Sequence, residues 1–174
     1  MERSRSFENP VVELRPLNID MQVELFNLFQ SIAANPRMSL HLPWILRDMT
    51  STEAVQGLIV SKQKKEAAGV EFARVILSNS EIAGVISYSL NEDNSKHAEI
   101  GYFLGPTYTG RGIAVTALKV ITSGLISQNL QPVLNIEYNN IASQKVAIKA
   151  GFEYSGDCIL HNSRYYQYFF RRLG

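Results

Sequence analysis

Residues 99–114 read EIGYFLGPTYTGRGIA, and this stretch predicts a strand, a glycine-rich loop and a helix in direct succession. Gly110 and Gly112 allow the backbone of the loop to turn several N–H groups toward one point. The first N–H groups of the following helix have no partner within the helix, and they carry a partial positive charge. The loop is therefore a candidate anion site suited to phosphate, to which Arg111 adds a charge-assisted contact.

Two common phosphate-binding motifs do not fit this loop. A P-loop has a Lys and a Ser or Thr after its last glycine, but Ile113 and Ala114 follow Gly112. A dinucleotide fingerprint has a third glycine, but Val115 stands at that position. Taken alone, the loop could also be an ordinary turn between a strand and a helix.

Hydrophobic periodicity on both sides of the loop predicts seven strands and four helices. We expect strands at residues 12–15, 72–77, 82–90, 97–104, 133–138, 152–160 and 165–171, with polar turns at 78–81 and 91–96. We expect a first helix at 21–32, ended by Asn35-Pro36, and a second that begins after a capping box of Thr50 and Glu53. Two more helices are expected at 114–125 and at 141–150, the last ended by Gly151. An antiparallel meander followed by a strand–helix–strand unit predicts an α+β fold with a mixed, mostly antiparallel sheet.

Length and composition restrict the class of protein. The 174 residues suit a single domain spanning 1–174, and a net charge of +1 gives no global field for nucleic acid. No apolar run is long enough to span a membrane, and residues 1–6 do not lead into a signal peptide. The single cysteine, Cys158, forms no internal disulfide, and the three histidines lack metal-ligand spacing. We expect a cytoplasmic protein without metal, acting as a monomer or small homo-oligomer.

Two sequence blocks resemble a known family. Residues 109–114 are similar to the acetyl-CoA signature Q/R-x-x-G-x-G/A of the GNAT superfamily of N-acetyltransferases, with Thr109 in place of the usual Gln or Arg. Residues 140–152 resemble the N-x-x-S-x-x-V-x-x-K-x-G-F stretch of the RimJ/RimL-type branch, which acetylates the N-termini of ribosomal proteins. The resemblance implies the GNAT fold, acetyl-CoA as co-substrate, and direct transfer of acetyl to an amine.

The resemblance also implies a set of cofactor-binding residues. The backbone near the end of the 97–104 strand would polarise the thioester carbonyl, and the loop would hold the pyrophosphate. The residues that the resemblance assigns to cofactor binding are Phe103, Leu104, Thr109, Gly110, Arg111, Gly112, Ile113, Ala114, Asn140 and Ser143. Because no acyl-enzyme forms in this family, no nucleophilic cysteine is needed, and Cys158 is interpreted as an inert thiol.

Two residues are candidates for catalysis and one more for the acceptor site. Strand alternation puts Glu99, Gly101 and Phe103 on one face, where Glu99 could accept the amine proton through water. Glu99 could equally be a solvated or cross-strand-paired carboxylate. By resemblance, Ser143 would donate a proton to the leaving thiolate, although Ser143 and Asn140 could also serve only as helix caps. Trp44 could form a wall of the acceptor site, or it could equally be an ordinary core or lid tryptophan.

Three functions remain open at this point. The first is acetylation of a protein or peptide N-terminus. The second is acetylation of a small amine such as a polyamine, an amino acid or an antibiotic, although the segments 40–48 and 163–167 offer little acid beyond Asp48 for a polycation. The third is a non-catalytic acyl-CoA-binding module, which the departures at Thr109 and Gln167 would allow.

Overall fold

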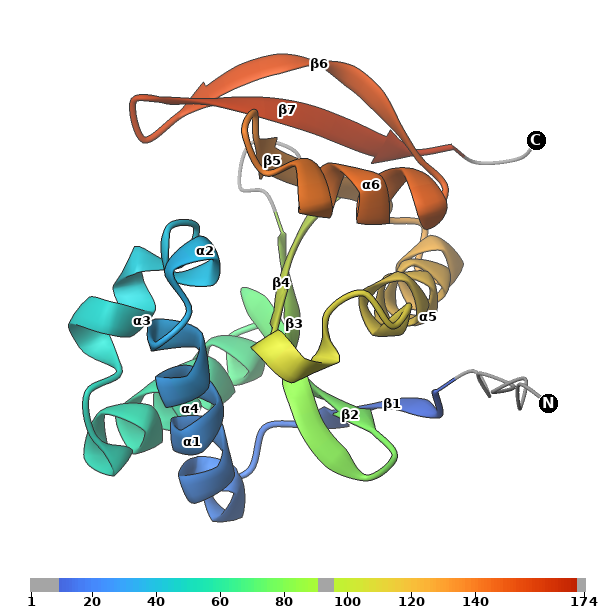
Figure 1. Cartoon of the computed structure of the whole chain (residues 1–174). Helices are drawn as coiled ribbons and strands as arrows, with labels where there is room; N and C mark the ends of the chain where they lie inside the picture. Colours follow the sequence, from blue (N-terminus) through green and yellow to red (C-terminus); the bar gives the residue numbers. More distant parts are fainter. Residues whose placement is uncertain (1–9, 91–95, 172–174) are drawn as a thin grey trace, which may run out of the picture.

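The computed structural model describes residues 10–90 and 96–171, and these residues form a seven-stranded sheet with helices on both faces (Figure 1). The strands are β1 (Val12–Pro16), β2 (Glu71–Ser78), β3 (Glu81–Leu90), β4 (His97–Leu104), β5 (Gln131–Glu137), β6 (Phe152–Leu160) and β7 (Ser163–Phe170). The α helices are α1 (Gln22–Ala33), α2 (Pro36–Ser39), α3 (Pro43–Asp48), α4 (Thr52–Ala67), α5 (Ile113–Ser127) and α6 (Ile141–Lys149). Two 3₁₀ turns, η1 (Ile19–Met21) and η2 (Pro106–Tyr108), complete the described elements.

The strands lie in the order β1-β2-β3-β4-β5-β7-β6. Every neighbouring pair is antiparallel except β4 and β5, which run parallel. The predicted mixed, mostly antiparallel sheet is therefore confirmed, and so is the meander of β2, β3 and β4. The predicted turn at 91–96 lies outside the described residues except for Lys96.

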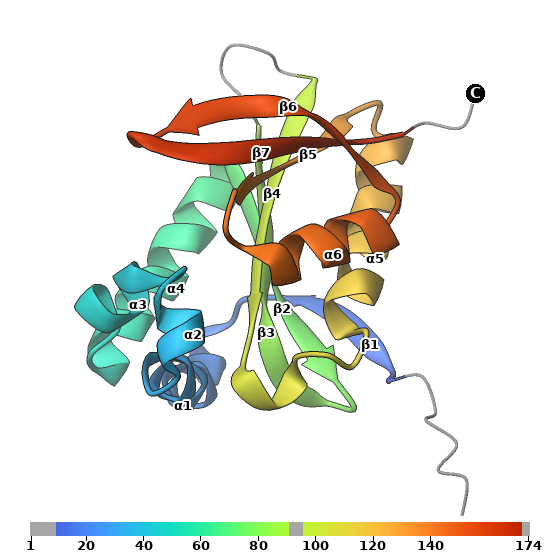
Figure 2. The ribbon, with the colours of Figure 1, turned by 45° about the horizontal axis from the view of Figure 1, so that its top comes forward.

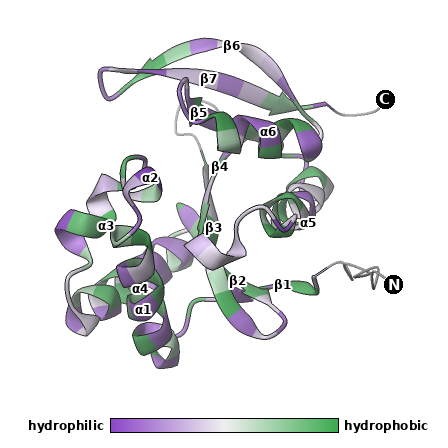
Figure 3. Cartoon of the chain, in the orientation of Figure 1, coloured by the Kyte–Doolittle hydropathy of each residue, from purple (hydrophilic) through white to green (hydrophobic). Residues whose placement is uncertain are grey.

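Two hydrophobic cores lie on opposite faces of this sheet. Helices α1 to α4 cover one face, and α5 and α6 cover the other (Figures 1 and 2). Phe29 and Ile32 of α1 are buried on the first face, while Ile113 and Leu118 of α5 are buried on the second. Burial of each such side chain contributes about 1.5–3 kcal/mol. Hydrophobic and hydrophilic residues both occur along α1 (Figure 3), as expected for a helix that packs on one side only.

The segment 36–48 differs from its prediction. No helix is expected from the sequence between α1 and α4, but the short helices α2 and α3 lie there, so the described residues form six α helices instead of the expected four. The reason lies in Asn35, whose Oδ1 accepts hydrogen bonds from the N–H groups of Arg37 and Met38. Proline is favoured at the first position of a helix, so Asn35-Pro36 both ends α1 and starts α2.

The start of α4 also differs by one residue from its prediction. Ser51, not Thr50, is the N-cap, and its Oγ accepts a hydrogen bond from the N–H of Ala54 at 3.2 Å. Thr50 and Ser51 are both good capping residues, and their order alone does not decide which one takes the cap. None of the described helices is both long and apolar enough to cross a membrane.

Two glycines test the packing of this fold in opposite directions. A Cβ atom at Gly84 would lie 2.1 Å from the backbone oxygen of Phe103, so Gly84→Ala should force β3 and β4 apart and cost about 1–3 kcal/mol. A Cβ atom at Gly124 in α5 would meet nothing within 4 Å, so Gly124→Ala should stabilise the helix by about 0.5–1 kcal/mol. Urea unfolding of the two variants measures both effects; equal stabilities would contradict the described β3–β4 contact.

Candidate active site

The site begins where β4 and β5 part. Their parallel pairing covers only His97–Gln131, Ala98–Pro132 and Glu99–Val133. Beyond Glu99, the rest of β4 still pairs with β3 but has no partner on its other side among the described strands. This unpaired edge opens a gap in the middle of the sheet.

Along β4, the backbone N–H and C=O groups of successive residues point alternately toward β3 and toward β5. Gly105, directly after β4, donates its N–H to the Ala83 oxygen on β3, while the Lys96 oxygen accepts from the Gln131 N–H on β5. The β3–β4 register runs without a shift from Gly84–Leu104 to Leu90–Ala98. Because backbone groups of successive residues point to opposite sides of a strand, the Leu104 N–H points into the gap. A backbone donor thus faces the site, as the prediction for Leu104 requires.

The glycine-rich loop ends beside this gap and exposes a helix N-terminus. Gly110 and Gly112 have φ angles of +74° and +79°, a left-handed conformation that favours glycine. No side chain of the described residues caps α5, and its first helical hydrogen bond runs from the Thr116 N–H to the Gly112 oxygen. The N–H groups of residues 113–115 therefore have no partner within the helix. No described atom lies within 4 Å of a Cβ built on either glycine, so the space before the loop is open.

The side chains of the loop differ in what they offer to a ligand. Ile113 and Ala114 are buried in the core, so only their backbone amides face an anion. The Thr109 hydroxyl donates to the Pro106 oxygen at 2.9 Å and is used inside the loop. Arg111 is exposed, and its guanidinium lies at a long distance of 3.5 Å from the Thr107 oxygen. Backbone amides and one exposed cation suit a diphosphate, so the residues present fit coenzyme A.

Ser143 and Asn140 meet on the other side of the gap, at the start of α6. Asn140 is the N-cap, and its Oδ1 accepts a hydrogen bond from the Ser143 N–H at 3.2 Å. The Ser143 Oγ lies 2.7 Å from the Tyr102 hydroxyl on β4. Burial raises the pKa of Tyr102 to about 12, against the opposing effect of its bond to Ser143. The sequence gives no signal for Tyr102, because a tyrosine in a strand is indistinguishable from an ordinary core residue.

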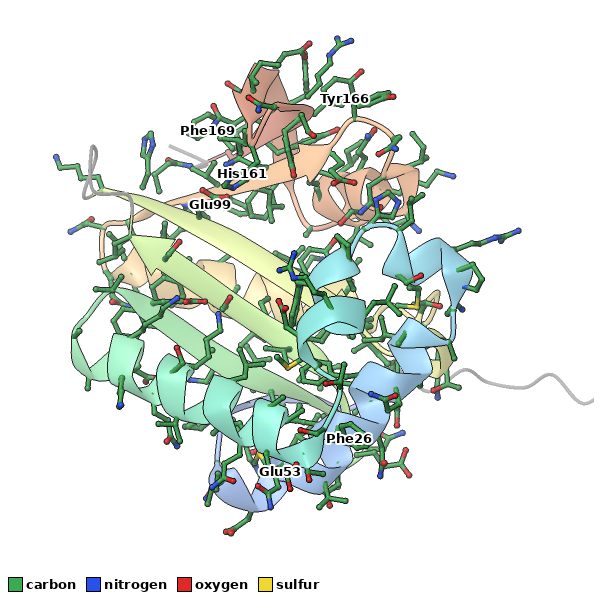
Figure 4. The ribbon with its side chains drawn as sticks, turned by 90° about the vertical axis from the view of Figure 1, so that its left-hand side faces the viewer. Phe26, Glu53, Glu99, His161, Tyr166 and Phe169 are labelled. Atoms are coloured by element: carbon green, nitrogen blue, oxygen red, sulfur yellow. The ribbon has the colours of Figure 1, made fainter. Side chains whose placement is uncertain are left out.

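The opposite face of β4 carries the acceptor-side candidates. Glu99 is exposed on the face covered by α1 to α4 (Figure 4). Phe103 packs edge-on against Trp44, with ring centroids 5.9 Å apart, so the structure groups Phe103 with the acceptor side rather than with the loop. Trp44 belongs to α3 and, together with Phe103 and Gly101, lines a cavity of ≈ 340 Å³. The expectation that Glu99, Gly101 and Phe103 share one face is confirmed.

Further polar groups on this face join segments that are distant in the sequence. His41, in the turn between α2 and α3, lies with its Nδ1 2.6 Å from the Glu137 carboxylate at the end of β5. The Gln167 amide donates to the Asn135 oxygen at 3.1 Å, and the Cys158 Sγ lies 3.7 Å from the same oxygen. Burial, followed by the charges of Glu99 and Asp157, raises the pKa of Cys158. Residues 96 positions apart in the chain give no sequence signal of such contacts.

Metal binding has no visible basis in the described part of the chain. Nowhere in residues 10–90 and 96–171 do three His, Cys, Asp or Glu side chains gather closely enough to hold an ion. The candidate site combines backbone amides, the Arg111 guanidinium, hydroxyl groups, the exposed Glu99 carboxylate and aromatic rings.

Comparison with known proteins finds similarity to several acetyltransferases. The chain is 30% identical over 135 residues to the ribosomal-protein-serine acetyltransferase of Escherichia coli (strain K12), a match covering 74% of this chain and 73% of that protein. RimL, a ribosomal L7/L12 alpha-N-protein acetyltransferase solved with coenzyme A, has a TM-score of 0.79 at 23% identity, covering 91% of this chain and 92% of its own. The microcin C7 self-immunity acetyltransferase MccE, solved with acetyl-CoA and AMP, has a TM-score of 0.78 at 21% identity, covering 94% and 92%.

These comparisons agree with the two motifs from which the resemblance was drawn. The solved relatives hold coenzyme A or acetyl-CoA, the co-substrate that the sequence predicts. The model of the acetyltransferase (GNAT) domain matches residues 12–153, more than half of the chain. The chain therefore belongs to the GNAT family of acetyltransferases.

Proposed function

We propose that this acetyltransferase transfers acetyl from acetyl-CoA to the N-terminal α-amine of a protein or peptide, with ribosomal proteins of the cytoplasm as the leading candidates. The observation that carries the proposal is the gap between β4 and β5, which has donor-binding amides on one side and the exposed Glu99 on the other. The likeness to a ribosomal-protein-serine acetyltransferase supports the choice of acceptor.

The donor is held mainly by backbone groups in this proposal. The amides of residues 110–115 and the Arg111 guanidinium bind the diphosphate, because a helix N-terminus and a cation both favour negative charge. The Leu104 N–H donates a hydrogen bond to the thioester carbonyl and stabilises the negative charge that develops on its oxygen. Asn140 fixes the first turn of α6, and with it the position of Ser143.

The energy needed to deprotonate the acceptor favours an α-amine. An α-amino group has a pKa of ~8, so releasing its proton at pH 7 costs about 1 kcal/mol. A lysine amine, with a pKa of ~10.4, costs about 5 kcal/mol. An exposed carboxylate acting through water is a weak base, and it suits the first task better than the second.

The transfer itself needs no covalent enzyme intermediate. The amine nitrogen forms a bond to the carbonyl carbon, and the bond from that carbon to sulfur breaks. Glu99 accepts the amine proton through a water molecule, while the Ser143 hydroxyl protonates the departing thiolate and recovers a proton from solvent. Trp44 and the cavity beside Phe103 receive the acceptor.

A panel of acceptors tests the proposal. Peptides beginning with Ser, Ala or Met are compared with their Nα-blocked counterparts carrying an internal lysine, and with free lysine and spermidine. We expect release of free thiol and a gain of one acetyl group by mass spectrometry only with unblocked peptides. Preferred acetylation of spermidine or of the blocked peptides would overturn the choice of acceptor, and binding of CoA without transfer to any amine would indicate a non-catalytic module.

Ser143→Ala tests the proposed proton donor. Turnover should fall by roughly 10–100-fold, with little change in affinity for acetyl-CoA, because the lost group acts only as the thiolate departs. Steady-state kinetics and calorimetric titration with CoA measure the two effects separately. Ser127→Ala, at the far end of α5, is the matched control, and turnover equal to that control would remove Ser143 from the mechanism.

Glu99→Gln tests the proposed base. At pH 7 the turnover of an unblocked peptide should fall by about 10–100-fold, because the amine proton loses its acceptor. At pH 9 the loss should shrink, since an α-amine with a pKa of ~8 is then already deprotonated. Glu24→Gln, an exposed carboxylate in the first turn of α1, serves as the control. An equal loss at both pH values would contradict the role of Glu99 as a base.

A further inference from the structure

The hydroxyl of Tyr102 reaches Ser143 from the centre of the sheet. Tyr102 lies on β4, and its side chain packs against the core on the α5 and α6 side, between Ile100 and Leu104. Its hydroxyl lies 2.7 Å from the Ser143 Oγ, although 41 residues separate the two in the chain. The ring therefore links the strand that faces the gap to the helix that carries the proposed proton donor.

The direction of this hydrogen bond follows from the chemistry of the two groups. Burial holds the pKa of Tyr102 far above neutrality, so the phenol keeps its proton. A phenol is also a stronger acid than an alkyl hydroxyl, which makes it the better donor of the pair. Ser143 Oγ then accepts from Tyr102, and its own hydrogen remains free to point elsewhere.

The backbone of Ser143 is fixed independently of this bond. Its N–H donates to the Asn140 Oδ1, so the first turn of α6 is already held in place. What remains free without Tyr102 is the rotation of the Ser143 side chain, which has three staggered positions. A single donor to the Oγ selects the position in which the hydroxyl hydrogen is available on the side away from Tyr102.

We propose that Tyr102 is the positioning residue that orients the Ser143 hydroxyl toward the departing thiolate; this inference rests on the proposed function. Strand β4 then supplies three groups to the proposed reaction. They are the Glu99 carboxylate on the acceptor face, the Leu104 N–H in the gap, and the Tyr102 hydroxyl, which is hydrogen-bonded to Ser143. Tyr102 acts only through Ser143 and touches neither substrate.

The substitution Tyr102→Phe removes the hydroxyl and leaves the partly buried ring in place. The turnover number should fall about 3–30-fold, while the KM for acetyl-CoA stays within about twofold, because donor binding uses the loop rather than Tyr102. Tyr168→Phe is the matched control, since Tyr168 is a buried tyrosine of the same core whose hydroxyl does not contact Ser143. Thermal melts of both variants establish that the fold is intact.

A double-mutant cycle separates positioning from a structural effect. In the Ser143→Ala background, Tyr102→Phe should cause no further loss of turnover, because there is no hydroxyl left to orient. Additive losses, or turnover of Tyr102→Phe equal to that of Tyr168→Phe, would overturn the positioning role alone. A wild-type protein that transfers acetyl to no amine would overturn the proposed function, and the positioning role with it.

Discussion

The short parallel contact between β4 and β5 is the constraint on which the rest of the site depends. Three residue pairs hold the two strands together, and beyond them β4 presents an unpaired edge to the interior of the molecule. Buried backbone N–H groups need partners, so such an edge is costly unless water or a ligand reaches it. The loop before α5 and the start of α6 border the same gap. The candidate anion site and the Ser143 hydroxyl therefore lie beside each other.

The two faces of β4 separate the two halves of the chemistry. Side chains of one parity, such as Tyr102, point toward α5 and α6, where the donor-binding loop lies. Side chains of the other parity lie on the opposite face, where Phe103 lines the cavity beside Trp44 and Glu99 is exposed farther along the strand. A donor and an acceptor approaching from opposite faces would meet only in the gap, because the remainder of the sheet is closed by hydrogen bonds.

Local sequence predicted the strands and the long helices well, because their signals are local: alternation in β2 to β4, the apolar stripe of α5, and Gly151 after α6. It failed where one signal serves two elements, as Asn35-Pro36 does by ending α1 and starting α2. The loop and Ser143 as site candidates come from motifs and the family resemblance, and Glu99 comes from strand alternation; their roles stay predictions. Tyr102 and the pair of His41 with Glu137 were missed, because their partners are 41 and 96 residues away and no local pattern encodes such contacts.

The central claim is that the backbone N–H groups at the start of α5, which have no partner within the helix, bind the diphosphate of coenzyme A. NMR tests this claim directly. Backbone amide signals of ¹⁵N-labelled protein are followed while coenzyme A is added. We predict that the largest shifts fall on residues 110–115, with smaller ones at Ser143 and Leu104. Shifts concentrated elsewhere, such as around the hollow beside Lys119 and Phe170, with residues 110–115 unchanged, would contradict the account.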